Sequence, residues 1–219
     1  MGNFGYSIYR CIYKWRFSKS LLINIFAAEA LKGATELEDS FNELVNAAIT
    51  AKANHAAIVE VGKIKFVEDF RKACEQNVCR KYATNWMCPP GVGSFEAVKT
   101  QACRYQYGLL FQTVHQVASS FDWKGMMSAK KDHDKVFREV LSNLKNKHNL
   151  QEILALNAGA CEFCNRCTFL DNEPCRFPEE AFPSVEAFGI DVINLEKTCG
   201  IPYYNGKNTV SYVGLILFN

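Results

Sequence analysis

The clustering of the cysteines constrains the fold and chemistry of this chain more than any other feature of its sequence. Seven of the ten cysteines fall into two short groups, within residues 74–88 and 161–175. Clustered spacings in a chain of 219 residues are more typical of metal binding or catalysis than of disulfides, although the even count permits them. A chain of this length can bury a sizeable core without crosslinks. The cysteines are Cys11, Cys74, Cys79, Cys88, Cys103, Cys161, Cys164, Cys167, Cys175 and Cys199.

The second group is the more specific of the two. It has the form Cys161-x2-Cys164-x2-Cys167-x7-Cys175. Cysteines at successive steps of three are typical of the C-x2-C-x2-C-x3-C-P run that binds iron–sulfur clusters in bacterial ferredoxins, although here the fourth cysteine is more distant. Zinc sites more often combine two separated Cys-x2-Cys pairs. Because all four donors are soft sulfur atoms, we predict one [4Fe–4S] cluster; the alternatives are a structural zinc site and reduced core cysteines.

The first group has wider spacing, and residues 89–91, Pro-Pro-Gly, stiffen the chain directly behind it. We predict that its three thiolates hold a second cluster; the alternative is a loop with incidental cysteines. A fourth ligand could be Cys103, Cys199 or a group other than cysteine. Without a fourth thiolate, one iron would be open to a substrate, as an iron–sulfur enzyme requires. The three predicted ligands are Cys74, Cys79 and Cys88.

Hydrophobic periodicity and cap residues predict helices that alternate with strands. We therefore expect an α/β fold: a mixed sheet of about four strands, helices packed on it and two cysteine-rich loops, with a ferredoxin-like α+β arrangement as the alternative. Thr35-x-x-Glu38 reads as a capping box that starts the first helix. The predicted strands are 57–61, 107–117, 151–156 and 209–218, and the later predicted helices are 94–105, 132–147 and 184–200.

Residues 1–34 are interpreted as an N-terminal extension, and residues 35–219 as one cysteine-rich metal-binding domain. Basic residues before the apolar run 21–28 resemble a weak signal peptide, but we favour an extension or helix. That run is far shorter than the roughly 20 residues that span a bilayer. The net charge of +2 comes without a basic stripe, which argues against nucleic-acid binding. We expect a cytoplasmic protein.

Other polar residues receive structural interpretations. None of the four histidines has ligand spacing to another, and His133 and His148 are expected on or near the polar side of the helix 132–147. Ser184 is expected to cap a helix that carries Glu186 and Asp191. An acidic residue in a first turn is favoured by the helix dipole, so Glu186 needs no catalytic role.

Both cysteine groups and the segments around them resemble the family of predicted metal-binding proteins called domain of unknown function 2284. Beyond the cysteines, the resemblance rests on Pro89-Pro90, on residues 176–178 (Arg-Phe-Pro) and on residues 183–192 (Pro-Ser-Val-Glu-Ala-Phe-Gly-Ile-Asp-Val). It covers roughly residues 45–219. The resemblance implies a cytoplasmic metal or iron–sulfur protein, mainly of anaerobic microbes, and no known reaction. It also raises the alternative that Glu186 or Asp191 faces the metal site.

We predict from these patterns a metal-binding protein with one or two [4Fe–4S] clusters that transfers electrons to a redox partner protein. One alternative is an iron–sulfur enzyme with an open iron site. A further alternative is a zinc-stabilised interaction module without a redox role.

Overall fold

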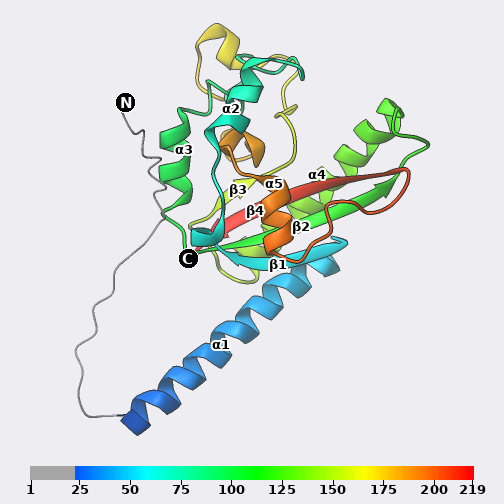
Figure 1. The fold of residues 1–219 in the computed structure, drawn as a ribbon. Helices are drawn as coiled ribbons and strands as arrows, with labels where there is room; N and C mark the ends of the chain where they lie inside the picture. Colours follow the sequence, from blue (N-terminus) through cyan, green and yellow to red (C-terminus); the bar gives the residue numbers. More distant parts are fainter. Residues whose placement is uncertain (1–22) are drawn as a thin grey trace, which may run out of the picture.

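A four-stranded antiparallel sheet of order β1-β2-β4-β3 forms the centre of the molecule (Figure 1). The computed structural model describes residues 23–219, with side chains from Thr35 onward, so Cys11 lies outside the described part. The long strands β2 and β4 pair over ten residues, from Tyr107 opposite Phe218 to Gln116 opposite Thr209. The strands are β1 (His55–Glu60), β2 (Tyr107–Gln116), β3 (Leu154–Leu156) and β4 (Thr209–Phe218).

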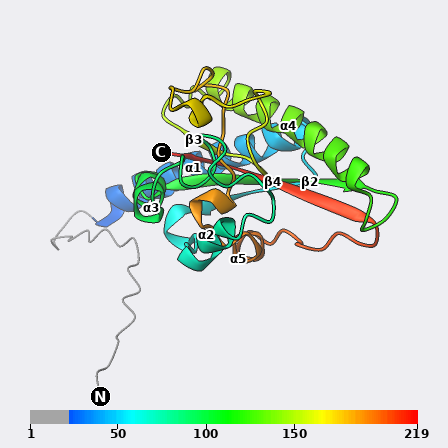
Figure 2. The ribbon, with the colours of Figure 1, turned by 90° about the horizontal axis from the view of Figure 1, so that it is seen from above.

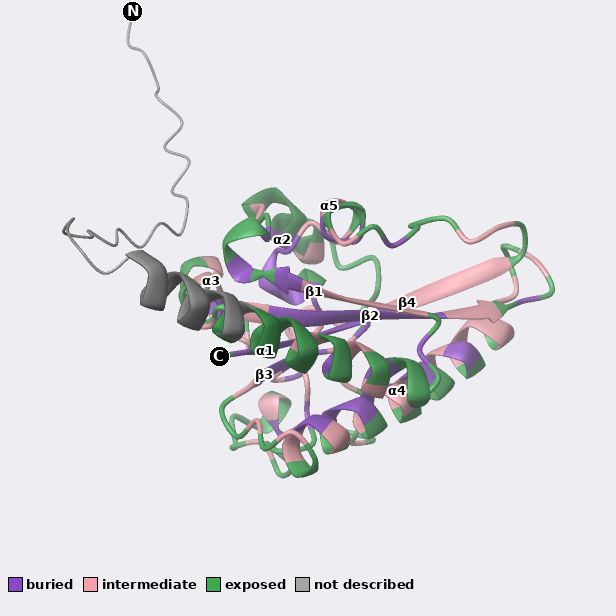
Figure 3. Ribbon diagram, turned by 90° about the horizontal axis from the view of Figure 1, so that it is seen from below, coloured by how far each residue is buried: buried purple, intermediate pink, exposed green. Residues whose placement is uncertain are grey.

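Helices cover both faces of this sheet (Figures 2 and 3). On one face lie α1 (Ile23–Thr50) and α4 (Trp123–Asn146). On the other lie α3 (Phe95–Ala102), α5 (Val192–Thr198) and the 3-10 turn η3 (Glu186–Phe188), with α2 (Glu68–Glu75) packed beside η3.

The covering of both faces explains why the central strands read as unbroken apolar runs. Successive side chains of a strand point to opposite faces. Leu109 and Phe111 pack toward α1 and α4, while Leu110 between them packs toward α3, η3 and α5. All three are fully buried. The predicted α/β class with about four strands is confirmed, and neighbouring strands are antiparallel throughout. In this fold a helical segment lies between every two successive strands. A ferredoxin-like fold differs, because in its β-α-β-β-α-β order two strands follow each other directly.

Two predicted helix starts are wrong. Helix α1 begins at Ile23, so Thr35 lies inside the helix and cannot cap it. Helix α4 begins at Trp123 rather than near residue 132, and the Asp122 carboxylate accepts a hydrogen bond from the Gly125 amide at its start. By contrast, the Ser94 hydroxyl caps α3 as predicted, by accepting from the Ala97 amide.

The segment 184–200 is two helical pieces rather than one. The Ser184 hydroxyl accepts a hydrogen bond from the Ala187 amide of η3, and η3 is followed by Gly189 in the left-handed conformation with φ of 70°. Asp191 then caps α5 separately, by accepting from the Asn194 amide. The break places Ile190 in the core, bridged to Phe66, which a continuous helix would not allow. Within residues 23–219, no helix is long and apolar enough to cross a membrane.

Candidate metal centre

The two cysteine groups lie in two loops at the same end of the molecule (Figure 1). The first loop, residues 76–94, joins α2 to α3, and Cys74 is on the last turn of α2 before it. The second loop, residues 157–185, joins β3 to η3.

The loops contact each other directly, mainly through Trp86. Its indole N–H donates to the Glu173 carbonyl at 3.0 Å, and its ring meets Phe169 edge-on at a centroid distance of 5.1 Å. An ion pair between Lys81 and Glu162, at 3.3 Å, adds a second link. Two segments that are far apart in sequence therefore form one cysteine-rich surface.

All four cysteines of the second group line one small pocket of about 20 Å³. Their thiols are free, and Trp86 from the first loop closes part of the pocket. Burial raises the pKa of the Cys161 thiol, and the negative charges of the three other thiolates raise it further. The sequence prediction that these four side chains gather at one place is thus compatible with the structure. They are Cys161, Cys164, Cys167 and Cys175.

The three thiols of the first group interact electrostatically with one another. Burial raises the pKa of Cys74, and the neighbouring Cys79 thiolate adds to that effect. Burial also raises the pKa of Cys88, with further contributions from Cys79, Cys74 and, across the loops, Cys161. Cys88 is therefore the link between the two groups.

Within the described residues, no three or more histidine, cysteine, aspartate or glutamate side chains surround a common metal-sized position. The thiols share pockets and electrostatic fields without forming a closed coordination sphere. Cys103 and Cys199, considered as a fourth ligand, are the C-cap residues of α3 and α5, and they line none of the pockets that contain the predicted ligands. Burial raises the pKa of Cys199 to about 11, as for a thiol packed against the core.

The two acidic residues singled out by the resemblance occupy different positions. Glu186 lines the groove that also contains Cys74 and Cys79, and its charge contributes to the raised pKa of Cys74. Asp191 lines the same groove, but its side chain is mostly buried, caps α5 and pairs with Lys65 at 3.4 Å. Only Glu186 is thus exposed beside a candidate ligand.

Arg71 and Asn85 organise the first loop and were not singled out in the sequence. The Arg71 guanidinium is buried on α2 and donates to the Gly93 carbonyl, while Nε and Nη1 have no hydrogen-bond partner among the described residues. Desolvation lowers its pKa, and its charge favours the thiolate of Cys74, one helical turn away. Asn85, also buried, accepts from the Met87 amide at 3.0 Å. An isolated Arg or Asn carries no sequence signal for such a role.

The histidine interpretation is wrong in one case. His133 does not lie on the polar side of α4: it is fully buried, with Nδ1 2.8 Å from the Thr113 hydroxyl and its ring stacked near Phe111. His133 is buried because α4 packs against β2, where Thr113 and Phe111 contact its ring. Neither His133 nor His148 lines a pocket that contains cysteine.

Comparison with known proteins identifies the family. No curated protein and no solved structure shows significant similarity to the chain. The family model for predicted metal-binding proteins, DUF2284, matches residues 57–218, which span the whole sheet except the start of β1, together with both cysteine loops. Free thiols that gather from two loops are consistent with that description. The chain belongs to the DUF2284 family of predicted metal-binding proteins.

Proposed function

We propose that this protein is an iron–sulfur electron carrier in which the second group holds one [4Fe–4S] cluster and the first group holds another. One observation carries the proposal: the contact of Trp86 with Glu173 and the ion pair of Lys81 with Glu162 hold the two cysteine loops together. The charge of Cys161 on the second loop accordingly adds to the raised pKa of Cys88 on the first. Adjoining sulfur-rich sites suit the passage of single electrons. The proposed ligands are Cys161, Cys164, Cys167 and Cys175 for one cluster and Cys74, Cys79 and Cys88 for the other.

The chemistry of the donors fits such clusters. All seven side chains are thiols, none is consumed in a disulfide, and soft sulfur ligands favour iron–sulfur clusters or zinc over magnesium or calcium. The pocket at the second group is only about 20 Å³, so the four thiols surround a small space rather than a preformed cavity. Metal sites are seldom preformed without their metal, because binding and local folding are coupled.

Residues around the thiols support their ligand role. The positive charge of Arg71 favours the thiolate of Cys74 on α2. The Asn85 side chain lowers the pKa of Cys88 against the dominant effect of burial. Trp86 and Phe169 pack edge-on against each other at the junction of the loops. A bound cluster would supply one-electron transfer at a potential set by its charge, hydrogen bonds and exposure.

The second loop also presents apolar side chains to solvent. Phe163, Leu170 and Phe177 are each more than two-fifths exposed, and the rings of Phe163 and Phe177 lie 4.8 Å apart. Exposed aromatic side chains are enriched in protein interfaces. We infer that a redox partner protein docks here, beside the second group.

The first test is metal analysis of the full chain purified without oxygen. We expect iron and acid-labile sulfide, with broad visible absorbance that bleaches on reduction by dithionite. A colourless, zinc-loaded protein would instead support the zinc-stabilised module.

Single substitutions then assign the ligands. Cys164→Ser should remove about half of the iron if two similar clusters are present. Cys199→Ser is the matched control and should retain all of it, because Cys199 packs against the core. Equal iron content in the two variants would contradict the assignment of the second group.

A further inference from the structure

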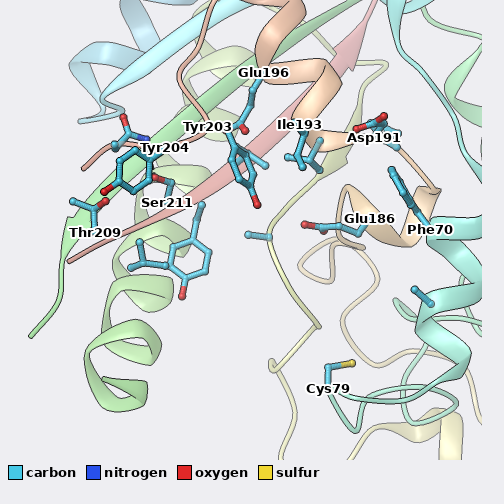
Figure 4. Close-up of a pocket in the computed structure, with 18 of the residues that line it drawn as sticks. Phe70, Cys79, Glu186, Asp191, Ile193, Glu196, Tyr203, Tyr204, Thr209 and Ser211 are labelled. Carbon is cyan, nitrogen blue, oxygen red and sulfur yellow. Dashed lines mark hydrogen bonds between the residues drawn. The ribbon is translucent and has the colours of Figure 1, made fainter. Parts of the chain in front are cut away.

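A groove beside the first cysteine group has the size of a small-molecule site. Its volume is about 720 Å³, within the range of roughly 300–1,000 Å³ typical of ligand pockets. It runs from Cys74 and Cys79, at the α2 end, past η3 to the start of β4. Figure 4 shows the side chains of Glu186, Ile193 and Tyr203 extending into this space. We call it the aromatic groove.

The walls of the aromatic groove expose large apolar surfaces. Phe70 is 45% exposed, Tyr203 is 61% exposed and Tyr204 is 74% exposed, and all three line it. Tyr212, on β4, also lines the groove, with its hydroxyl donating to the Met126 carbonyl of α4. Aromatic side chains that line one concavity form a surface against which a planar ring can pack.

A buried carboxylate provides an independent sign of a ligand. Glu196 on α5 lines the groove and is only 2% exposed. Its Oε1 accepts from the Gln112 side-chain amide at 2.6 Å, whereas its Oε2 has no hydrogen-bond partner among the described residues. Gln112 has no donor left for it, because the same amide nitrogen also donates to the Pro202 carbonyl. A buried carboxylate oxygen without a donor is costly, so this position favours a ligand that donates a hydrogen bond.

The charges that line the groove indicate whether the donor on the ligand is cationic, neutral or anionic. Its lining includes the carboxylates of Glu186, Asp191 and Glu196 but no lysine, arginine or histidine. Lys65 pairs with Asp191, whereas Glu186 makes no ion pair with any described residue. Glu186 and Glu196 are close enough that the charge of Glu186 adds to the effect of burial in raising the pKa of Glu196. An anionic ligand would be repelled, and a cation would be attracted.

We propose that the aromatic groove binds a small aromatic amine, with its ring against the aromatic side chains of the wall, such as Tyr203, and its ammonium group at the carboxylates of Glu196 and Glu186. The amine would lie beside Cys74 and Cys79. Ammonium groups are stabilised both by carboxylates and by the faces of aromatic rings. This inference goes beyond the proposed metal centre and does not depend on it.

Three probes with the same phenol ring test the charge preference: tyramine, which is cationic, 4-ethylphenol, which is neutral, and 3-(4-hydroxyphenyl)propionate, which is anionic. Binding to the full anaerobically purified chain is measured by isothermal titration calorimetry. We expect tyramine to bind at least about tenfold more tightly than the anion, with the neutral phenol between them. Equal affinities, or no binding of tyramine at millimolar concentration, would overturn the inference. If the same sample contains iron, the proposed metal centre is still supported even when tyramine does not bind.

Substitutions locate the amine. Glu196→Gln and Glu186→Gln should each weaken tyramine binding about fivefold or more, since each removes a charge-assisted contact. Because Glu186 is exposed, Glu186→Gln is expected to fold. It therefore tests the site even if Glu196→Gln does not fold. Glu38→Gln, on the exposed surface of α1, is the matched control and should leave the affinity unchanged. Retained affinity in Glu186→Gln and in every folded Glu196→Gln sample would refute the site.

Discussion

The sheet and the cysteine loops of this protein are held together in different ways. The strands are fixed by burial: Leu109, Leu110 and Phe111 are fully enclosed between two helical layers. The loops contain only one short 3-10 turn, Thr168–Asp171, and depend on a few specific contacts such as those of Trp86. A continuous core of this kind is stabilised by its own packing, whereas loops with few packing contacts gain much of their order from a bound ligand or metal.

Backbone conformation reinforces this difference. Within the first loop, Asn77, Arg80 and Ala83 have positive φ, a conformation that non-glycine residues seldom adopt. Such strain persists where surrounding interactions over-determine the backbone, often near functional groups. Positive φ is found nowhere in the described strands β1–β4. The sheet therefore provides the stable core of the fold, whereas the loops carry the cysteine thiols.

The largest effect should come from the core of the sheet and helices. Phe137→Ala should lower the free energy of unfolding by about 3–5 kcal/mol, because the ring is fully buried between Phe111 and Phe182. Urea unfolding followed by far-ultraviolet circular dichroism measures it. Phe121→Ala is the control, since that ring is 93% exposed, and should change stability by less than about 0.5 kcal/mol. A cost under about 1 kcal/mol for Phe137→Ala would show that stability resides elsewhere.

Acid should weaken the same core through His133. Burial lowers the pKa of His133 from 6.5 to about 4, so the folded state resists its protonation. The unfolded chain binds the proton first; stability is therefore full above pH 6.5 and falls progressively toward pH 4, by roughly 3 kcal/mol. Urea midpoints between pH 7 and pH 4 test this.

His133→Phe isolates the contribution of that imidazole. The substitution should flatten the decline between pH 6.5 and pH 4, whereas His55→Gln, at the start of β1, should leave it in place. An unchanged slope in His133→Phe would mean that another group is responsible.

A smaller effect is expected in the first loop. A Cβ added at Gly91 would lie 2.6 Å from the Asn85 carbonyl oxygen and 3.0 Å from the Trp86 Cα, both backbone atoms that cannot rotate away. Gly91→Ala should cost about 1–3 kcal/mol and reduce metal content, measured by urea unfolding and iron analysis. Gly33→Ala in α1 has open space and should stabilise the helix by up to about 1 kcal/mol. Normal iron in Gly91→Ala would separate loop packing from metal binding.

The smallest effect concerns the contact between the loops. Trp86→Phe keeps an aromatic ring near Phe169 but removes the donor to the Glu173 carbonyl, at a cost of about 1 kcal/mol. Hydrogen exchange should speed up in both loops while β2 and β4 stay protected. Trp123→Phe, at an exposed position, is the control. Faster exchange in the sheet would show that the loops and the sheet unfold together.

The candidate site could be predicted only in its chemistry. The spacing of Cys161, Cys164 and Cys167 indicates metal binding before any fold is known, and the family assignment agrees. The electrostatic effect of Cys161 on Cys88 and the unpartnered oxygen of Glu196 both depend on segments brought together from distant parts of the chain. A local sequence pattern cannot predict which residues from distant segments come to lie close together.

The sequence by itself determined the strands and caps whose signals are local. Runs of β-branched and aromatic residues define β2 and β4, and Ser94 marks the start of α3. The tertiary structure alone decided the strand order, the burial of His133 and the break at Gly189. The physical reason is that propensity and capping act over a few residues, whereas burial depends on which distant surfaces pack together.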